Sequence, residues 1–327
     1  MHSRTILVLS LAGSALALVA RPAPVLARAS YPFTQLVAFG DEFSDNGNGS
    51  YAHGVTGNPA LVYGFGTWTN GPVAVSYLTD LFGVPLIDYA YGGCCGGGSA
   101  GATIDSAYTT PDAGAPSIKD QIANYTSSGS RGAASSLFFI WAGQNDLSKH
   151  TDAFWLGDPH NTDFANNFAS ITAANVQSLI KLGARNIVVA NIYPKHLAPV
   201  TKKYLCGSNP DCVTTWGKVI QQANSALQSK LSLMNTNGAK IVYYDSFEFL
   251  TNLMSNAAAN GFSQSLNYYC DGDSSDPNCK WAECWDSKTY TLPAPGFFWV
   301  NFVQATTKVY QLMATDMKIT IGQALKL

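Results

Sequence analysis

The sequence predicts an α/β protein in which helices cover both faces of a central parallel sheet, a three-layer sandwich. Short apolar runs alternate with stretches of helical period along the chain, which is the pattern of parallel strands joined by helical crossovers. Polar turns follow the apolar runs in "GDEFSDNGN", "YGGCCGGG" and "AGQND", where ligands bind in such sheets. The 327 residues, 46% of them hydrophobic, suit one large core better than two.

The first half of the chain provides three predicted strands and one predicted helix. "FTQLVAFGD" (33–41) is an apolar run that ends in a turn, and "PLIDYAYGG" (85–93) and "SLFFIWAGQND" (136–146) have the same form. Between the first two, "VAVSYLTDLFG" (73–83) has a helical period and closes on Gly83, a common helix end.

The second half continues the alternation. A helix is predicted from Phe168 to Leu182, with Gly183 as its stop. The apolar run "ARNIVVANIYP" (184–194) is predicted to be another buried strand. A long helix is expected over 213–238, and "AKIVYYDSF" (239–247) follows it as a strand.

The N-terminus predicts a secretory signal peptide at 1–27. A positively charged residue precedes the apolar stretch 6–20, and small residues follow, with cleavage after Ala20 or Ala27. A membrane anchor is the alternative, but no later segment has the roughly 18 apolar residues of a span. We therefore expect one domain at 28–327, secreted to the extracellular space.

Charge argues against nucleic-acid and membrane partners. Charged residues form 12% of the chain and the net charge is −2, against a usual charged share of roughly 25%. No basic patch or cationic amphipathic helix is visible. The composition favours a neutral partner rich in hydroxyl groups, such as a glycan or polysaccharide.

Cysteine and sequon patterns also fit an exported glycoprotein. The seven cysteines predict disulfides with one thiol left over, and Cys206 and Cys212 bracket a loop short enough to close on itself. No CxxC occurs and the histidines are scattered, so we predict no metal site and no cofactor. Asn124 is the better glycan acceptor, because Asn48 lies in the first polar turn.

Four blocks in order carry a resemblance to a known family. They are "FGDEFSDNGNGSYA", "TWTNGPVAVSYLTDLFGVPLIDYAYGG", "WAGQND" and "GFFWVNFVQATTKVYQLMA". The chain resembles the SGNH (GDSL) hydrolase superfamily, most closely its secreted fungal acetylesterase branch, carbohydrate esterase family 16. The resemblance spans nearly the whole mature chain and implies an SGNH hydrolase-like, flavodoxin-like sheet.

The family's mechanism implies roles for particular residues. A block I serine attacks an ester carbonyl, a C-terminal His deprotonates it, and an Asp three residues earlier orients that His. The serine amide, a block II Gly and a block III Asn hold the oxyanion. Here Gly93 and Asn145 match the Gly and the Asn, so the resemblance implies that these oxyanion or substrate-binding donors are retained.

The reactive residues of the family are replaced. Glu42 stands at the nucleophile position, and Asn301 and Gln304 stand at the Asp and His positions. A one-residue shift would instead place Val300 and Val303 there, and either frame removes the dyad. Because Asn and Gln cannot accept a proton near neutral pH, ordinary serine esterase catalysis is predicted to be absent.

Two interpretations of the replaced triad remain open. In the first, a polar network is retained: Glu42 accepts hydrogen bonds from Gln304 and Asn145, and Asn301 holds Gln304. In the second, these side chains are only what folds well around an abandoned site.

Glu42 could also belong to a carboxylate pair. Asp45, Asp146 and Asp105 are the candidate second carboxylates, and a facing pair would permit retaining or inverting glycoside hydrolysis. The alternative is that such aspartates anchor loops to backbone amides.

Three functions therefore remain, and the sequence leaves open whether the protein is an enzyme. It is a catalytically silent pseudo-esterase that binds a glycan, free or acylated; or a glycoside hydrolase that uses Glu42; or an acetyl-ester hydrolase of the family type. Family resemblance alone does not choose among them.

Overall fold

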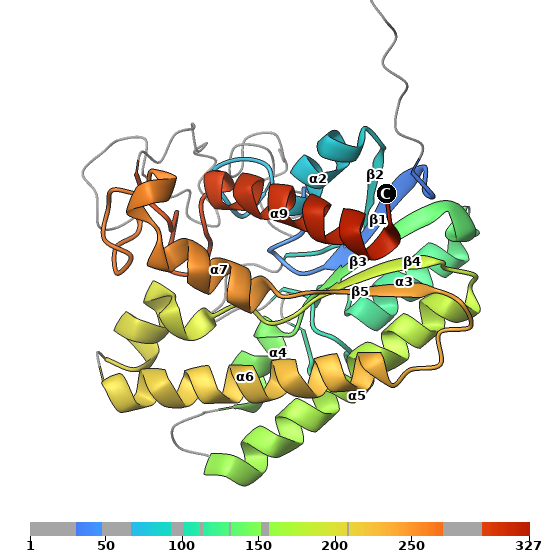
Figure 1. Ribbon diagram of the computed structural model, residues 1–327. Coiled ribbons are helices and arrows are strands. Elements are labelled where there is room, and N and C mark those ends of the chain that lie inside the picture. Colours follow the sequence, from blue (N-terminus) through green and yellow to red (C-terminus); the bar gives the residue numbers. More distant parts are fainter. Residues whose placement is uncertain are drawn as a thin grey trace, which may run out of the picture. The chain divides into compact units, whose positions relative to one another are not determined.

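Figure 1 shows the computed structural model of the chain. It describes residues 31–47, 67–92, 101–111, 114–130, 132–151, 157–207, 209–270 and 296–327. Within the chain, Tyr31–Leu327 forms one compact unit. The predicted signal peptide, Asn48 and Gly93 lie outside the described residues.

A five-stranded parallel sheet forms the centre of this unit, which confirms the predicted fold class. The strands are β1 (Gln35–Gly40), β2 (Leu86–Asp88), β3 (Ser136–Trp141), β4 (Asn186–Ala190) and β5 (Lys240–Tyr244), in the order β2-β1-β3-β4-β5. The chain leaves β1 toward β2 on one side and returns to β3 on the other. The topological switch point, where such sheets bind ligands, therefore lies between the ends of β1 and β3.

Three helices cover one face of the sheet (Figure 1): α2 (Ala74–Phe82), α7 (Ser246–Ser255) and α9 (Thr307–Leu325). Leu36 and Ala38 of β1 point into this layer. Since successive strand side chains alternate between faces, the intervening residues must supply the other layer.

The other face is covered by α3 (Ile118–Ser127), α5 (Gly157–Lys181) and α6 (Pro210–Ser232). Val37 and Phe39 of β1 pack into this second core. Both faces of the central strands β1, β3 and β4 are buried, which explains why these strands form continuous apolar runs in the sequence rather than alternating ones.

The predicted elements agree with the structure in kind but not always in length. Gly83 (φ 65°) and Gly183 (φ 97°) follow α2 and α5, where their left-handed conformation suits glycine. Helix α5 begins at Gly157 rather than Phe168, and α6 runs over Pro210–Ser232 rather than 213–238. Asn209 explains the earlier start of α6, because its Oδ1 caps the helix by accepting from two backbone amides.

The end of β1 is held by a glutamine from α3. Gln121 Oε1 accepts from Gly40 N at 2.9 Å, and Gln121 Nε2 donates to Gly40 O at 2.8 Å. A Cβ at Gly40 would lie 2.7 Å from Ser44 Cβ, so the turn requires glycine here. The side-chain amide of Gln121 thus fixes both peptide groups where the chain leaves the sheet.

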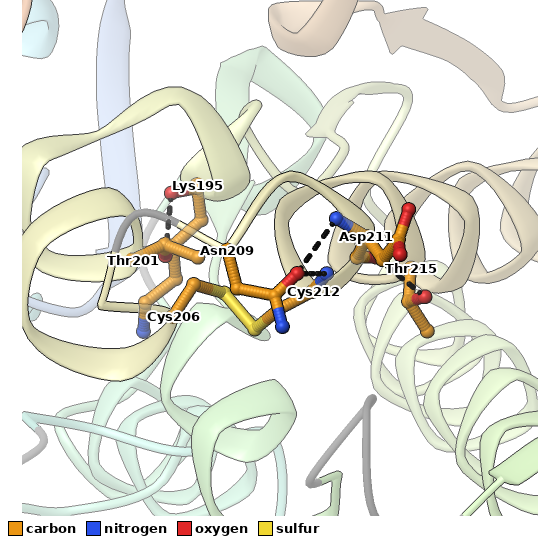
Figure 2. Close-up of a disulfide and its surroundings, with 7 residues drawn as sticks. All are labelled: Lys195, Thr201, Cys206, Asn209, Asp211, Cys212 and Thr215. Carbon is orange, nitrogen blue, oxygen red and sulfur yellow. Dashed lines mark hydrogen bonds between the residues drawn. A yellow bond between two sulfur atoms is a disulfide. The ribbon is translucent and has the colours of Figure 1, made fainter.

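A disulfide joins Cys206 to Cys212, as their spacing predicts (Figure 2). It ties the π-helical turn η6 (Val200–Leu205) to the start of α6. Cys270 is also disulfide-bonded. The remaining cysteines, Cys94, Cys95, Cys279 and Cys284, lie outside the described residues.

Other sequence predictions concern membranes, metals and glycans. None of the helices in the described ranges is long and apolar enough to cross a membrane. Within the same ranges, no cluster of His, Cys, Asp and Glu could hold a metal ion. Asn124 is exposed on α3, and its glycosylation stays a prediction.

Candidate functional site

The polar turn after β1 begins with an aspartate that anchors the loop. Asp41 is fully buried; its Oδ1 accepts from Phe43 N at 3.1 Å and its Oδ2 from Gln144 Nε2 at 2.6 Å. Gln144 follows β3, so this bond ties the two strand ends together across the switch point.

Glu42 lies at the centre of the site. Its side chain is half-buried, and its Oε2 accepts from Asn145 Nδ2 at 2.9 Å. Asn145 Nδ2 also donates to Ala102 O at 3.1 Å. The predicted contact between Glu42 and Asn145 is therefore present, and it uses the amide group that the family resemblance assigns to the oxyanion.

Gly143 explains how the chain brings Asn145 to this position. Its φ of 116° suits glycine, and a Cβ there would lie 2.3 Å from the ring of Phe168. The turn leads directly into α4 (Gln144–His150). The predicted polar turn "AGQND" is thus the first turn of a helix, which points Gln144 and Asn145 back toward β1.

Lys195 is a member of the site that the sequence analysis missed. It follows β4 and is only 7% exposed. Its Nζ donates to Gln144 O at 3.1 Å and to Ser148 Oγ. The one available signal was its place beyond the end of the strand 184–194, at the edge of the sheet that carries the polar turns.

The electrostatics of the site are dominated by burial. Burial lowers the pKa of Lys195 to about 8, against the attraction of Glu42 and Asp41. Burial also raises the pKa of Glu42, while the bond from Asn145 and the charge of Lys195 oppose that rise. The pKa of Asp41 is raised well above its usual value by burial and by the neighbouring Glu42. Two adjacent carboxyl groups that resist ionisation thus face one buried ammonium group.

The C-terminal block differs from the predicted network. Asn301 Oδ1 accepts from the backbone amides of Gln304 at 2.7 Å and Val303 at 2.9 Å, so it holds the backbone of Gln304 rather than its side chain. Gln304 Oε1 accepts from the Tyr310 hydroxyl at 2.5 Å, and its buried Nε2 has no hydrogen-bond partner among the described residues. The predicted bond from Gln304 to Glu42 is therefore not formed.

The candidate second carboxylates each have structural partners. Asp45 accepts from Gly47 N at 2.8 Å and Gly92 N at 2.7 Å, and Trp68 Nε1 lies 3.4 Å away. These bonds join the first turn to the segment after β2, as a loop anchor does. Gly93, the predicted oxyanion glycine, follows just beyond the described range.

The other two candidate carboxylates are Asp146, which follows Asn145 in α4, and Asp105. Asp146 accepts from Ile104 N at 3.1 Å, and burial raises its pKa to about 6. Asp105 forms an ion pair with the exposed Lys119 at 2.9 Å. No hydrogen bond joins Asp45, Asp146 or Asp105 to Glu42 within the described part of the chain.

Several buried polar atoms near the carboxyl pair have no hydrogen-bond partner among the described residues. They are Ser44 Oγ, Gln144 Oε1, Tyr193 Oη and Gln304 Nε2. The charges of Glu42 and Asp41 act on Tyr193 and help burial to raise its pKa. Because buried polar groups are almost always hydrogen-bonded, these atoms mark places for water or a polar ligand.

Comparisons with known proteins place this geometry in a family. The chain is 23% identical over 324 residues to the GDSL esterase/lipase EXL4 of Arabidopsis thaliana, covering 87% of this chain and 90% of that protein.

Two solved structures also align. An extracellular lipase from Streptomyces rimosus aligns at 13% identity and a TM-score of 0.43, over 86% of this chain and 99% of the lipase. The gut microbial diltiazem-metabolizing enzyme BT4096 aligns at 12% identity and a TM-score of 0.42. That alignment covers 89% of this chain, which spans about half, 47%, of the longer enzyme.

The sequence model of GDSL-like lipases and acylhydrolases matches residues 36–314, from the second residue of β1 into α9. That range includes the turn of Glu42, the helix start at Asn145 and the block of Asn301 and Gln304. The chain belongs to the GDSL-like lipase/acylhydrolase family.

Proposed function

We propose that this protein is a family member without serine esterase activity, which binds a hydroxyl-rich glycan, free or acylated, at the switch point between β1 and β3. The observation that carries the proposal is the 2.9 Å hydrogen bond from Asn145 Nδ2 to Glu42 Oε2. An oxyanion donor stabilises negative charge that appears only in the transition state. Here the donor is already bonded to a carboxyl oxygen of the protein, so an ester oxygen would have to compete with Glu42.

Proton transfer gives the proposal a second support. Asn301 Oδ1 and Gln304 Oε1 are both engaged by protein groups, and neither side chain can act as a base near neutral pH. Ser44 is the nearest serine along the turn, but its buried hydroxyl has no hydrogen-bond partner in the part of the chain that the structure describes. It therefore lacks the neighbouring base that activates a serine nucleophile.

The proposed ligand follows from the polarity of the site. Ser44 Oγ, Gln144 Oε1, Tyr193 Oη and Gln304 Nε2 offer donors and acceptors without partners. Carbohydrate hydroxyls, which both donate and accept, complement such a mixture. Secretion through the N-terminal leader and the preference for neutral glycans, rather than for charged polymers, are parts of the same proposal and derive from the sequence.

A second candidate, glycoside hydrolysis with Glu42 as the acid, has one specific observation in its favour. Burial raises the pKa of Glu42, which is how glycosidases keep a carboxylic acid protonated near neutral pH. The mechanism also needs a second carboxylate free to act. Asp45 and Asp146 instead accept backbone amides, so the binding function is the better supported.

Ester hydrolysis tests the proposal directly. The wild-type protein should hydrolyse p-nitrophenyl acetate no faster than a heat-denatured sample. The triple variant Glu42→Ser, Asn301→Asp, Gln304→His should gain measurable activity, and adding Asn145→Ala to it should remove most of that gain, since one oxyanion donor contributes on the order of 10²-fold. Clear wild-type turnover would refute the silent pseudo-esterase.

Polysaccharide cleavage separates the two candidates. The wild-type protein should bind soluble or insoluble glycans from a panel without releasing products that carry new reducing ends. Release that Glu42→Gln abolishes, with glycan binding unchanged, would instead establish the glycosidase. Asp211→Asn, a change of an exposed carboxylate at the start of α6, is the matched control.

A further inference from the structure

A cavity of about 610 Å³ lies at the edge of the sheet that β5 forms. Its lining comes from the end of β5, from α7 with the short turn after it, and from α9. None of the switch-point residues, Asp41, Glu42, Asn145 or Lys195, contributes to it. Its volume is within the range of small-molecule sites, ~300–1,000 Å³.

The cavity carries negative charge. Asp245, Glu248 and Asp316 line it, and its lining contains no Lys, Arg or His. Asp245 Oδ1 is used locally, because it accepts from Glu248 N and from Asn191 Nδ2. Glu248 and Asp316 form no ion pair with any described residue. Two carboxylates are therefore available to a cationic ligand.

The asparagines of α7 and the turn after it add amide groups to the lining. Asn256 Nδ2 donates to Asn252 O, and Asn260 Nδ2 donates to Asn256 O, each at 2.9 Å. Each of these bonds uses one of the two N–H groups of an amide, so the second N–H and the Oδ1 acceptor remain for a ligand. A ligand rich in N–H and O–H donors would complement this lining.

Buried and aromatic groups complete the cavity. The Tyr244 hydroxyl is buried, its side chain being 2% exposed, and has no hydrogen-bond partner of normal geometry. The Asp316 carboxylate lies close enough for its charge to act on this hydroxyl. Phe249 and Tyr243 also line the cavity, and aromatic rings attract both C–H faces of sugars and cations.

We propose that this cavity is a binding site for a small hydroxylated primary amine, of which an amino sugar is the representative. The ammonium group would pair with Asp316 and Glu248, and the hydroxyls would donate to the asparagine Oδ1 atoms. Charge-assisted hydrogen bonds of this kind are the strong ones. The site is separate from the one at Glu42 and does not depend on the function proposed for it.

Calorimetric titration of the full chain with the glucosamine disaccharide tests this site. We expect saturable binding, at least tenfold weaker for the N-acetylated disaccharide, which keeps the hydroxyls but loses the charge. Spermidine, which keeps charge but has no hydroxyls, should also bind at least tenfold more weakly. Asp316→Asn should weaken glucosamine binding at least tenfold, and Glu248→Gln, on the exposed rim, is a second variant that should weaken it.

Asp211→Asn is the matched control, because it neutralises an exposed carboxylate that does not line the cavity and should leave this binding unchanged. Circular dichroism establishes that each variant is folded. Absence of glucosamine binding, binding that neither Asp316→Asn nor Glu248→Gln weakens, or equal binding of the N-acetylated sugar or of spermidine would overturn the assignment. An equal loss on Asp211→Asn would also overturn it, because the effect would then follow the net charge of the protein rather than the cavity.

Discussion

Carboxylates at the switch point and carboxylates at the β5 edge are used in opposite ways. Around the end of β1, Asp41 and Asp45 are buried and accept several hydrogen bonds each from backbone and side-chain donors. In the cavity beyond β5, Glu248 and Asp316 have no ion pairs within the described ranges. The first group builds the fold, whereas the second is free to bind. The number of hydrogen bonds that a carboxylate accepts, rather than its burial alone, distinguishes the two roles.

The largest effect should come from Asp45→Ala. The change leaves the amides of Gly47 and Gly92 and the indole of Trp68 without their acceptor, and an unsatisfied buried group costs about 1–3 kcal/mol. We expect the free energy of unfolding to fall by about 3 kcal/mol, measured by urea denaturation. Asp211→Ala is the matched control: its exposed side chain at the start of α6 forms no ion pair with a described residue and should be worth less than ~1 kcal/mol. Equal losses for the two variants would erase the distinction between anchoring and surface carboxylates.

Glu42→Gln should have an intermediate effect with a defined pH dependence. Because burial raises the pKa of Glu42 in the folded state, this carboxyl favours folding below its unfolded pKa and loses that contribution as pH rises through the folded value. Glutamine keeps an acceptor for Asn145 without the charge. The variant should melt about 2–4 °C higher than wild type at pH 8, the shift that ~1 kcal/mol produces in a domain of this size.

The gain from Glu42→Gln should shrink as the pH falls to 4, where the wild-type carboxyl is itself protonated. Thermal melts from pH 4 to pH 8 provide the measurement. A variant that melts below wild type throughout would mean that the charge of Glu42, attracted by Lys195, stabilises the turn.

The smallest effect on stability should come from Asp316→Asn. This side chain is half-buried at the cavity and has no ion pair to lose, so the free energy of unfolding should change by less than ~0.5 kcal/mol. Chemical denaturation without ligand measures it. A loss comparable to that of Asp45→Ala would place Asp316 with the anchoring carboxylates.

The three central strands, β1, β3 and β4, were predictable because they are buried on both faces and therefore form uninterrupted apolar runs. Helices α7 and α9 were not predicted: α7 begins at Ser246, inside the expected strand 239–247, where the apolar run continues and only the cap by Asp245 marks the change. Helix α9 begins inside the last family block and continues beyond its end to Leu325; the block was assigned by its motif rather than by its helical period.

The site was predictable in position more than in contact. Strand ends bring Glu42 and Asn145 together, as the topology requires. The side chain of Gln304 adopts a conformer that accepts a hydrogen bond from Tyr310. The spacing of residues in the sequence does not determine which conformer a side chain adopts. Lys195 was missed because nothing in "YPKHLAP" distinguishes a lysine that folds back into the site from one that extends into solvent. The β5 cavity joins residues far apart in sequence, and no local pattern marks it.

The double hydrogen bond between Gln121 and Gly40 has an evolutionary consequence. The exit of the chain from β1 is held by an amide that recognises only peptide groups, so the course of the turn does not depend on the side chain two residues later. Position 42 can therefore exchange a hydroxyl for a carboxylate while its surroundings stay in place. Because the turn is held by groups other than the side chain at position 42, a lineage can lose, keep or change an activity by single substitutions there without a change in the fold.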